Sequence, residues 1–347
     1  MILKRRFELP LPAGLAATLL LAAAAGCSSN NNPGAGANPD GGTVIQPGGG
    51  TITQATKVTN SPADFYVPFD AIPSPDAQTV YFLAVAPAQG AAVFKVAAAG
   101  GAVTPLVSGV PLSSPVSIGI STDGNTLYCA DPSGWTDNDL GAIFSVSTAG
   151  SAGTPTELKE TDDYSPRTLV VSRQNNADVI YFAGNDKADG IPGIFTDIGG
   201  TVTPILKGAN LDPTALAVSS TGIVYYLDSA HTESQGNLFK VTSATAGTQI
   251  GTAQNLQLNF PGGMALTLDE SAVVTPALVS QTAAANAGGT NFARIDVNTG
   301  VVTMQSAGSL TDPLVEPGGL HRALNSDRYS YVDLGANQSG TVYLLSK

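Results

Sequence analysis

The pattern of apolar and polar positions repeats along the chain from about residue 49 to residue 347. Each unit contains a small-residue or apolar run, a polar turn, an apolar run that includes tyrosine, and a run of the form Gly-x-apolar-Phe-x-Val. The clearest copy runs from Pro115 through the Asp123–Gly124 turn to Gly141–Val146. Apolar positions two residues apart are typical of strands with one buried face. No segment beyond residue 26 keeps a helical period, so the pattern predicts an all-β fold.

The centres of the second apolar runs mark six units. The first five centres are 47, 53, 44 and 49 residues apart, and the variation falls in polar loops. A repeat of this length and strand content predicts a six-bladed β-propeller with one four-stranded antiparallel sheet per blade. The six runs are Val80–Phe82, Leu127–Cys129, Ile180–Phe182, Val224–Tyr226, Val273–Thr275 and Tyr329–Tyr331.

Two more strands of each unit are recognised by composition. The first strand of each unit is short and consists mainly of small or apolar residues, which fit the crowded centre of a ring. We place first strands at Val116–Ile120, Thr168–Val171, Ala215–Val218, Met264–Leu268 and Leu320–Leu324. Third strands are predicted at Val93–Val96, Ile143–Val146, Ile194–Asp197, Leu238–Val241, Phe292–Ile295 and Val342–Leu345.

The fourth strands suggest how the ring closes. Gly100–Pro105, Gly199–Pro204 and Thr299–Thr303 share a glycine-led Thr/Val signature, and no residue follows Lys347 to supply this strand for the sixth unit. The same signature occurs at Gly49–Gln54. We therefore predict that an N-terminal strand, at about residues 51–57, completes the last blade and removes the open seam.

The N-terminal 26 residues have the features of an export signal. Lys4–Arg6 are basic, and the apolar run Leu15–Ala25 is too short to span a bilayer. Leu21–Cys27 resembles the lipobox of bacterial lipoproteins, with Ala24 where leucine is usual. The resemblance implies cleavage before Cys27 and acylation of its thiol by a lipid such as palmitate. Cleavage near Ala25, as in an ordinary secretory signal, is the alternative.

The segment after Cys27 is rich in Asn, Gly and Pro and lacks an apolar cluster, which predicts a disordered tether. We divide the chain into a signal (1–26), a lipidated cysteine with its tether (27–48) and one propeller domain (49–347). Ser28 stands where lipoproteins retained in the inner membrane carry Asp, so the resemblance to that sorting pattern implies the outer membrane.

Charge narrows the class of partner. The chain has a net charge of −12, and loss of residues 1–26 removes three basic residues and one acidic residue, which leaves −14. A nucleic acid would be repelled by this field, and so would an anionic lipid surface. We therefore expect attachment to the membrane through the lipid alone, a monomeric chain, and an envelope protein, peptide or glycan as partner. The second cysteine, Cys129, lies in an apolar strand and is predicted to be a buried structural thiol.

Acidic residues follow the second strands and precede the first strands, and these loops share one face of a propeller. The candidate binding face consists of Asp131, Trp135, Asp137, Asp139, Asp186, Asp228 and Asp333. Converging carboxylates suit Ca²⁺, for which Asp131, Asp228 and Glu316 are the candidate ligands. The alternative is that each Asp caps a turn by accepting bonds from nearby backbone amides.

The chain contains two histidines, His231 and His321, too far apart in sequence for a metal motif, and no Gly-x-Ser-x-Gly elbow. We assign no catalytic residue. His321 and Arg322 lie on a predicted first strand, so one of them faces the channel or His321 is a hydrogen-bonded strand residue.

The Pro115–Asp131 unit resembles the six-bladed propellers of the NHL, TolB-like and gluconolactonase groups, and the resemblance covers residues 49–347. Glu316 before Pro317–Gly319 is similar to the glutamate-bearing loop of the gluconolactonase propellers. Two functional hypotheses follow. The first is a non-catalytic binding or scaffold module that uses the acidic loop face. The alternative is a Ca²⁺-dependent hydrolase of the gluconolactonase type at the channel mouth.

Overall fold

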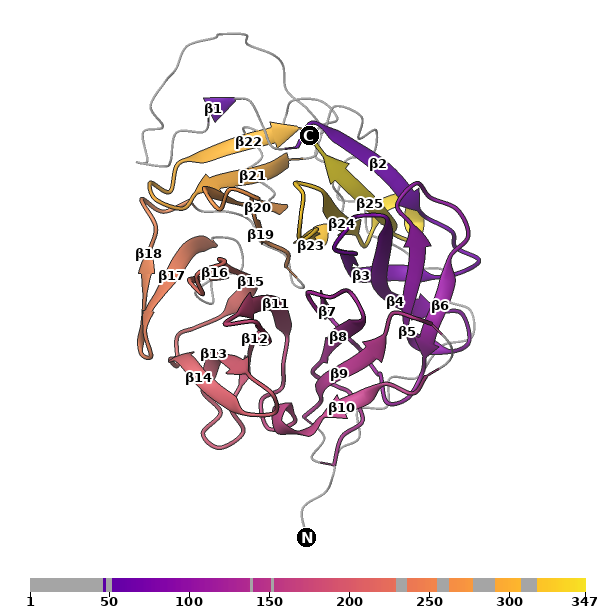
Figure 1. Cartoon of the computed structure of the whole chain (residues 1–347), viewed down its shortest axis with the longest axis horizontal. Helices are drawn as coiled ribbons and strands as arrows, with labels where there is room; N and C mark the ends of the chain where they lie inside the picture. Colours follow the sequence, from indigo (N-terminus) through magenta and orange to yellow (C-terminus); the bar gives the residue numbers. More distant parts are fainter. Residues whose placement is uncertain are drawn as a thin grey trace, which may run out of the picture. The chain divides into compact units, whose positions relative to one another are not determined.

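The computed structural model describes residues 46–47, 52–137, 140–150, 153–228, 236–254, 262–276, 291–306 and 317–347. Within the unit of residues 38–347, these form six sheets around a common centre (Figure 1). Each sheet contains four antiparallel strands in sequence order, apart from the strands contributed by the N-terminal part of the chain. The predicted six-bladed β-propeller is therefore confirmed.

Blades one to three follow the repeat directly. Blade one contains β3 (Tyr66–Pro73), β4 (Thr79–Ala86), β5 (Gly90–Ala97) and β6 (Thr104–Ser108). Blade two contains β7 (Ser117–Ile120), β8 (Thr126–Asp131), β9 (Ala142–Ser147) and β10 (Thr156–Leu158). Blade three contains β11 (Thr168–Gln174), β12 (Ala177–Asn185), β13 (Pro192–Asp197) and β14 (Val202–Lys207).

Blades four to six complete the set. Blade four contains β15 (Pro213–Val218), β16 (Val224–Asp228), β17 (Asn237–Ser243) and β18 (Ala246–Gln249). Blade five contains β19 (Ala265–Leu266), β20 (Ala272–Pro276), β21 (Asn291–Asp296) and β22 (Val302–Ser306). Blade six contains β23 (Pro317–Arg322), β24 (Tyr329–Asp333), β25 (Thr341–Ser346) and β2 (Gln54–Thr59). Two short 3-10 turns, η1 (Lys159–Thr161) and η2 (Ala336–Gln338), lie in loops.

The ring closes between blades six and one. The first strands β3, β7, β11, β15, β19 and β23 contact one another in that order, and β23 then contacts β3. β2 pairs with β25 in antiparallel register, with Gln54 opposite Ser346 and Thr56 opposite Leu344. The predicted closing strand is thus present, shifted about three residues toward the C-terminus. β1 (Gln46–Pro47) adds a fifth, parallel strand to β22, a pairing that the sequence did not predict.

Aromatic pairs between the second and third strands pack the blades. In four blades the two rings lie opposite each other in register and stack at centroid distances of 5.1 to 5.7 Å. These pairs are Phe82 with Phe94, Phe182 with Phe195, Tyr226 with Phe239 and Tyr331 with Tyr343. In blade two Cys129 faces Phe144 instead, and it is a free, fully buried cysteine, as predicted.

The first turn of several blades is closed by a hydroxyl. Ser121 Oγ donates to Asp123 at 2.6 Å and accepts the amides of Asn125 and Thr126. Ser74 and Thr267 make the corresponding bonds to Asp76 and Asp269. The repeat therefore holds its hairpins at the ends of the first strands in one geometry, which shapes the surface there.

Residues 1–45 lie outside the described residues, so the signal, the lipidation of Cys27 and the tether stay predictions. Among the residues that the structure does describe, no helix is long and apolar enough to cross a membrane.

Candidate functional site

The ring has two distinct ends. We call the loop face the end formed by the loops that enter the first strands and by the loops that join the second and third strands. We call the hairpin face the opposite end, where the first strands turn into the second strands. The candidate binding residues were placed on the loop face, so their surroundings are considered first.

Asp131, at the end of β8, is fully buried and bonds to backbone amides. Its Oδ2 accepts from the amides of Ser113 at 2.7 Å and Ser114 at 3.1 Å, and its Oδ1 accepts from the amide of Ser133 at 3.0 Å. Burial raises the pKa of Asp131, and these amides oppose that rise. The carboxylate therefore fastens the loop that enters β7 to the loop that leaves β8.

Asp228 and Asp333 end the second strands of blades four and six and have similar roles. Asp228 is 4% exposed and accepts from the amide of Asp212, in the loop that enters β15. Asp333 is 1% exposed and accepts from the amides of Gly335 and Ala336 and from the hydroxyl of Tyr331. The bonds of Asp333 match the turn-capping alternative, whereas the bond of Asp228 joins two separate loops.

The other candidates on this face lie nearer to solvent. Asp186 accepts from Lys207 Nζ at 2.7 Å, and Lys207 also contacts Asp189. Asp137 is exposed, 3.9 Å from Lys159 Nζ. Trp135 is 69% exposed, and its backbone amide donates to the Pro111 carbonyl. Asp139 lies outside the described residues. The structure thus places Trp135 and Asp137 on one exposed loop of blade two, and their role in binding stays a prediction.

A calcium site requires several oxygen ligands that converge on one point. Asp131 already directs both oxygens to backbone amides, and Asp228 belongs to a different blade. Within the described ranges, no three His, Cys, Asp or Glu side chains gather as a metal site would require. Glu316 lies outside those ranges. The described part of the candidate set therefore does not fit a calcium site.

The hairpin face contains a cavity of about 540 Å³, and all six blades line it. We call it the axial cavity. Five blades each contribute to its floor the residue at the same position of the first strand. The residues there are each paired with the centre of the second strand: Ile72 in blade one, Val170 in blade three, Ala217 in blade four, Ala265 in blade five and His321 in blade six. His321 is the polar member of this set, and the other four are apolar.

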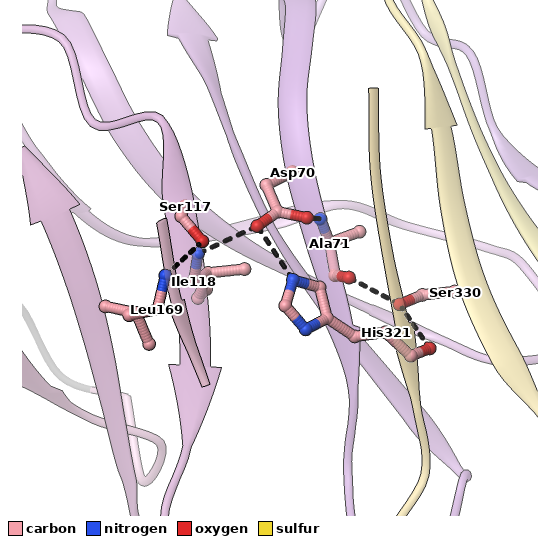
Figure 2. A network of polar contacts seen from close by, with 7 residues as sticks. All are labelled: Asp70, Ala71, Ser117, Ile118, Leu169, His321 and Ser330. Carbon is pink, nitrogen blue, oxygen red and sulfur yellow. Dashed lines mark hydrogen bonds and ion pairs between the residues drawn. The ribbon is translucent and has the colours of Figure 1, made fainter. Parts of the chain in front are cut away.

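His321 is hydrogen-bonded to a buried carboxylate (Figure 2). Asp70 on β3 is 1% exposed, and its Oδ2 lies 2.9 Å from His321 Nε2. The same oxygen accepts the amide of Ile118 on β7, and Oδ1 accepts the amide of Ala71. One side chain therefore joins the first strands of blades six, one and two, across the seam where the ring closes.

Gly319, on the same strand as His321, shows how tightly the first strands pack around Asp70. A Cβ atom on Gly319 would lie 1.6 Å from Asp70 Oδ1, so a larger residue there would displace the carboxylate. Sequence reasoning missed Asp70, because the first strand of blade one was not aligned with the others. The available signal was an acidic residue within the run Phe69–Ile72, at a position where blade two has Ser117 and blade three has Thr168.

The rim of the axial cavity carries charged and apolar side chains. Arg322 Nε donates to the Leu266 carbonyl at 2.7 Å, and Nη1 donates to carbonyls of its own hairpin, including that of Ala323 at 2.8 Å. Burial lowers the pKa of Arg322. Arg173 is exposed, and its guanidinium contacts the Thr122 hydroxyl at 3.4 Å. The rim also includes the acidic side chains of Asp269 and Glu270 and the apolar side chains of Leu268 and Leu324.

The comparisons with known proteins agree on the fold. No family model matches the chain, and no curated protein matches it. A gluconolactonase from Xanthomonas campestris is 12% identical over 87% of this chain and 99% of its own, with a TM-score of 0.53. A putative gluconolactonase is 11% identical over 85% of this chain and 94% of its own, with a TM-score of 0.53. A putative TolB from Agrobacterium tumefaciens is 14% identical over 84% and 92%, with a TM-score of 0.47. This chain is therefore a six-bladed β-propeller whose fold resembles the gluconolactonase structures.

Proposed function

We propose that this chain is a non-catalytic binding module of the bacterial cell envelope, anchored by a lipid on Cys27, and that the axial cavity is its ligand site. The observation that carries the proposal is the cavity itself. Its volume of about 540 Å³ falls within the usual range of small-ligand sites, and it combines an apolar floor with a few polar groups. This places the site on the hairpin face, whereas the sequence favoured the loop face.

The residues around His321 support binding rather than catalysis. His321 Nε2 is bonded to Asp70, and within the described part of the chain no serine, threonine or cysteine side chain is bonded to the imidazole. A side-chain nucleophile activated by this histidine would need such a contact. The hydrolase alternative is supported only by the fold, at 11% and 12% identity to the proteins named gluconolactonase.

The loop face keeps its predicted role as a partner surface. Trp135 and Asp137 are exposed there, and tryptophan is frequent in the centres of protein interfaces. An envelope protein, peptide or glycan is the expected partner. This part of the proposal rests on exposure and residue type.

A panel of small molecules with apolar bodies and cationic, neutral or anionic heads tests the cavity. Ligand-observed NMR with the mature chain should detect binding of at least one class. The variant Val218→Trp, which fills the mouth from β15, should abolish it, because Val218 lines the cavity and is half-buried. Trp135→Ala is the matched control on the other face. Binding that survives the Val218→Trp change would refute the proposed site.

The envelope location has its own test. Cys27→Ala should move the protein from the membrane fraction to the soluble exported fraction and abolish incorporation of labelled palmitate. Unchanged membrane association of a stable Cys27→Ala protein would refute the lipid anchor.

A further inference from the structure

The two ring nitrogens of His321 have different surroundings. Nε2 faces Asp70, a carboxylate that also accepts two backbone amides, so Nε2 carries the hydrogen in this contact. In a neutral ring the other nitrogen, Nδ1, is then a hydrogen-bond acceptor. Figure 2 shows Nδ1 on the side of the ring away from Asp70.

Nδ1 has no hydrogen-bond partner among the described residues. The His321 side chain is 10% exposed. Among the described residues, the fully buried side-chain atoms without a partner are Arg167 Nε and Gln305 Nε2, so Nδ1 is reached by solvent. His321 lines the axial cavity, which is large enough for a ligand. Its side chain is nine-tenths buried, and the unused acceptor Nδ1 is open to this cavity.

The negative charge of Asp70, behind the imidazole, determines which kind of ligand group His321 Nδ1 favours. Asp70 is buried, and its partners are two amides and the imidazole, so its negative charge polarises the ring and makes Nδ1 a stronger hydrogen-bond acceptor. A group that donates a hydrogen bond and carries positive charge gains from this arrangement. A carboxylate ligand would face the lone pair of Nδ1 and, behind the ring, the carboxylate of Asp70. Both would repel it.

The walls and rim agree with this polarity. Ile72, Val170 and Ala265 give the floor an apolar lining, and Leu268 and Leu324 are 47% and 44% exposed at the mouth. The Arg322 guanidinium is occupied by backbone carbonyls, while Asp269 and Glu270 add negative charge to the rim. The net charge of −12 attracts cations at longer range. Arg173 and Arg322 are the opposing positive charges at the mouth.

We propose that the axial cavity binds a small organic ammonium ion, whose apolar body lies on the floor and whose N–H donates to Nδ1 of His321, with Asp70 as the positioning residue. This inference rests on the proposed binding function and specifies its ligand class. The ammonium group belongs either to a free amine or to a lysine side chain of a peptide.

A matched series of probes tests the head group. Butylammonium, butanol and butyrate share one apolar body, and titration of the mature chain should rank them in that order, with the ammonium about tenfold tighter than the alcohol. Arg173→Gln should strengthen butylammonium binding and weaken any butyrate binding. A short peptide with one lysine, compared with butylammonium, tells a peptide-borne source from a free amine.

Imidazole nitrogen NMR provides a readout that leaves the residues of the cavity unchanged. The chain has two histidines, so His231→Asn identifies the His321 signals. At mildly alkaline pH, where an imidazole is normally neutral, Nε2 should carry the proton, and butylammonium should shift the Nδ1 resonance. His321→Phe should abolish the preference of the cavity for ammonium over alcohol.

The outcomes separate this inference from the proposed function. Binding that Val218→Trp abolishes but that favours butyrate, or a proton on Nδ1 in the free protein, would overturn the ammonium assignment and leave the cavity as a ligand site. Absence of any binding sensitive to Val218→Trp would overturn both.

Discussion

The two ends of the ring use the same side chain in opposite ways. On the loop face, Asp131 and Asp333 are buried, and burial raises the pKa of Asp131 while backbone amides stabilise its charge. On the hairpin face, Asp123 and Asp269 are exposed, and hydrogen bonds from Ser121 and Thr267 contribute most to lowering their pKa values to about 2. The two loop-face carboxylates hold loops in place through buried hydrogen bonds, whereas the two hairpin-face carboxylates stay charged and exposed to solvent.

The difference shows that a count of acidic residues does not locate a site. The loop face was favoured by its number of carboxylates, three of which are 0%, 1% and 4% exposed. The cavity lies at the other end, where one blade departs from the repeat by placing His321 among apolar residues. Five substitutions distinguish the roles of the two faces.

Gly319→Ala should have the largest effect. The added Cβ would overlap Asp70, so the carboxylate must leave His321 and Ile118 or the strands must separate. We expect a loss of about 3 kcal/mol in the free energy of unfolding, together with loss of cavity binding, measured by denaturant titration and ligand NMR. Gly208→Ala is the control, because its Cβ meets Leu211 at an ordinary 3.5 Å. Equal stability of the two variants would show that the seam is not tightly packed.

Asp131→Asn should damage the loop face alone. In either orientation the amide nitrogen would face a backbone donor, that of Ser113 or that of Ser133, which leaves a buried donor without an acceptor. The expected cost is about 2 kcal/mol of unfolding free energy, with ligand binding in the cavity unchanged in the folded fraction. A change in binding as large as the change in stability would remove the distinction between the two faces.

Arg322→Lys should loosen the rim of the hairpin face. Lysine cannot reproduce the forked donation of the guanidinium to the carbonyls of Leu266 and Ala323. We expect a loss of about 1 kcal/mol in unfolding free energy and weaker cavity binding, by thermal melts with and without ligand. Unaltered binding would mean that this hairpin does not shape the cavity.

Asp269→Asn should have a small effect that depends on pH. Because the folded pKa of Asp269 is lowered to about 2, its carboxylate stabilises the fold above pH 3.8, and this contribution is lost as the pH falls through about 2. The variant should be less stable than the parent at neutral pH, by less than about 1 kcal/mol since the group is exposed, and equal to it near pH 2. Denaturant titrations at both pH values provide the measurement. A difference that persists at low pH would contradict the assignment.

Trp135→Ala should have the smallest effect on the isolated protein. The side chain is 69% exposed, so the unfolding free energy should change by less than about 0.5 kcal/mol. Recovery of a partner from crosslinked membranes should decrease if the loop face binds one. Equal recovery by both proteins would exclude Trp135 from that contact.

The ring was readable from sequence because its signals are local and repeated. Period-two runs, a tyrosine or phenylalanine in each second strand and glycine-led fourth strands specify the blades, and even β2 carried the signature of a fourth strand. β1 was not foreseen, since a two-residue parallel strand has no pattern of its own.

The site was harder to predict because it depends on contacts between distant blades. His321 was recognised as a first-strand residue, and both readings of it hold: it is hydrogen-bonded, and it lines the axial cavity. Asp70 is 251 residues away, and only the closed ring brings the two together. The burial of Asp131, Asp228 and Asp333 likewise depends on how adjoining loops fold over them.

The pairing of β2 with β25 also has a consequence for biosynthesis. Gln54 is made long before Ser346, yet the two residues are neighbours in the finished sheet. β2 must therefore wait, with its edge exposed, until β25 has been made. Such a long loop closes slowly, so we expect a protein that stops before Thr341 to leave β2 without a partner and β24 with an open edge, and to be degraded or to aggregate.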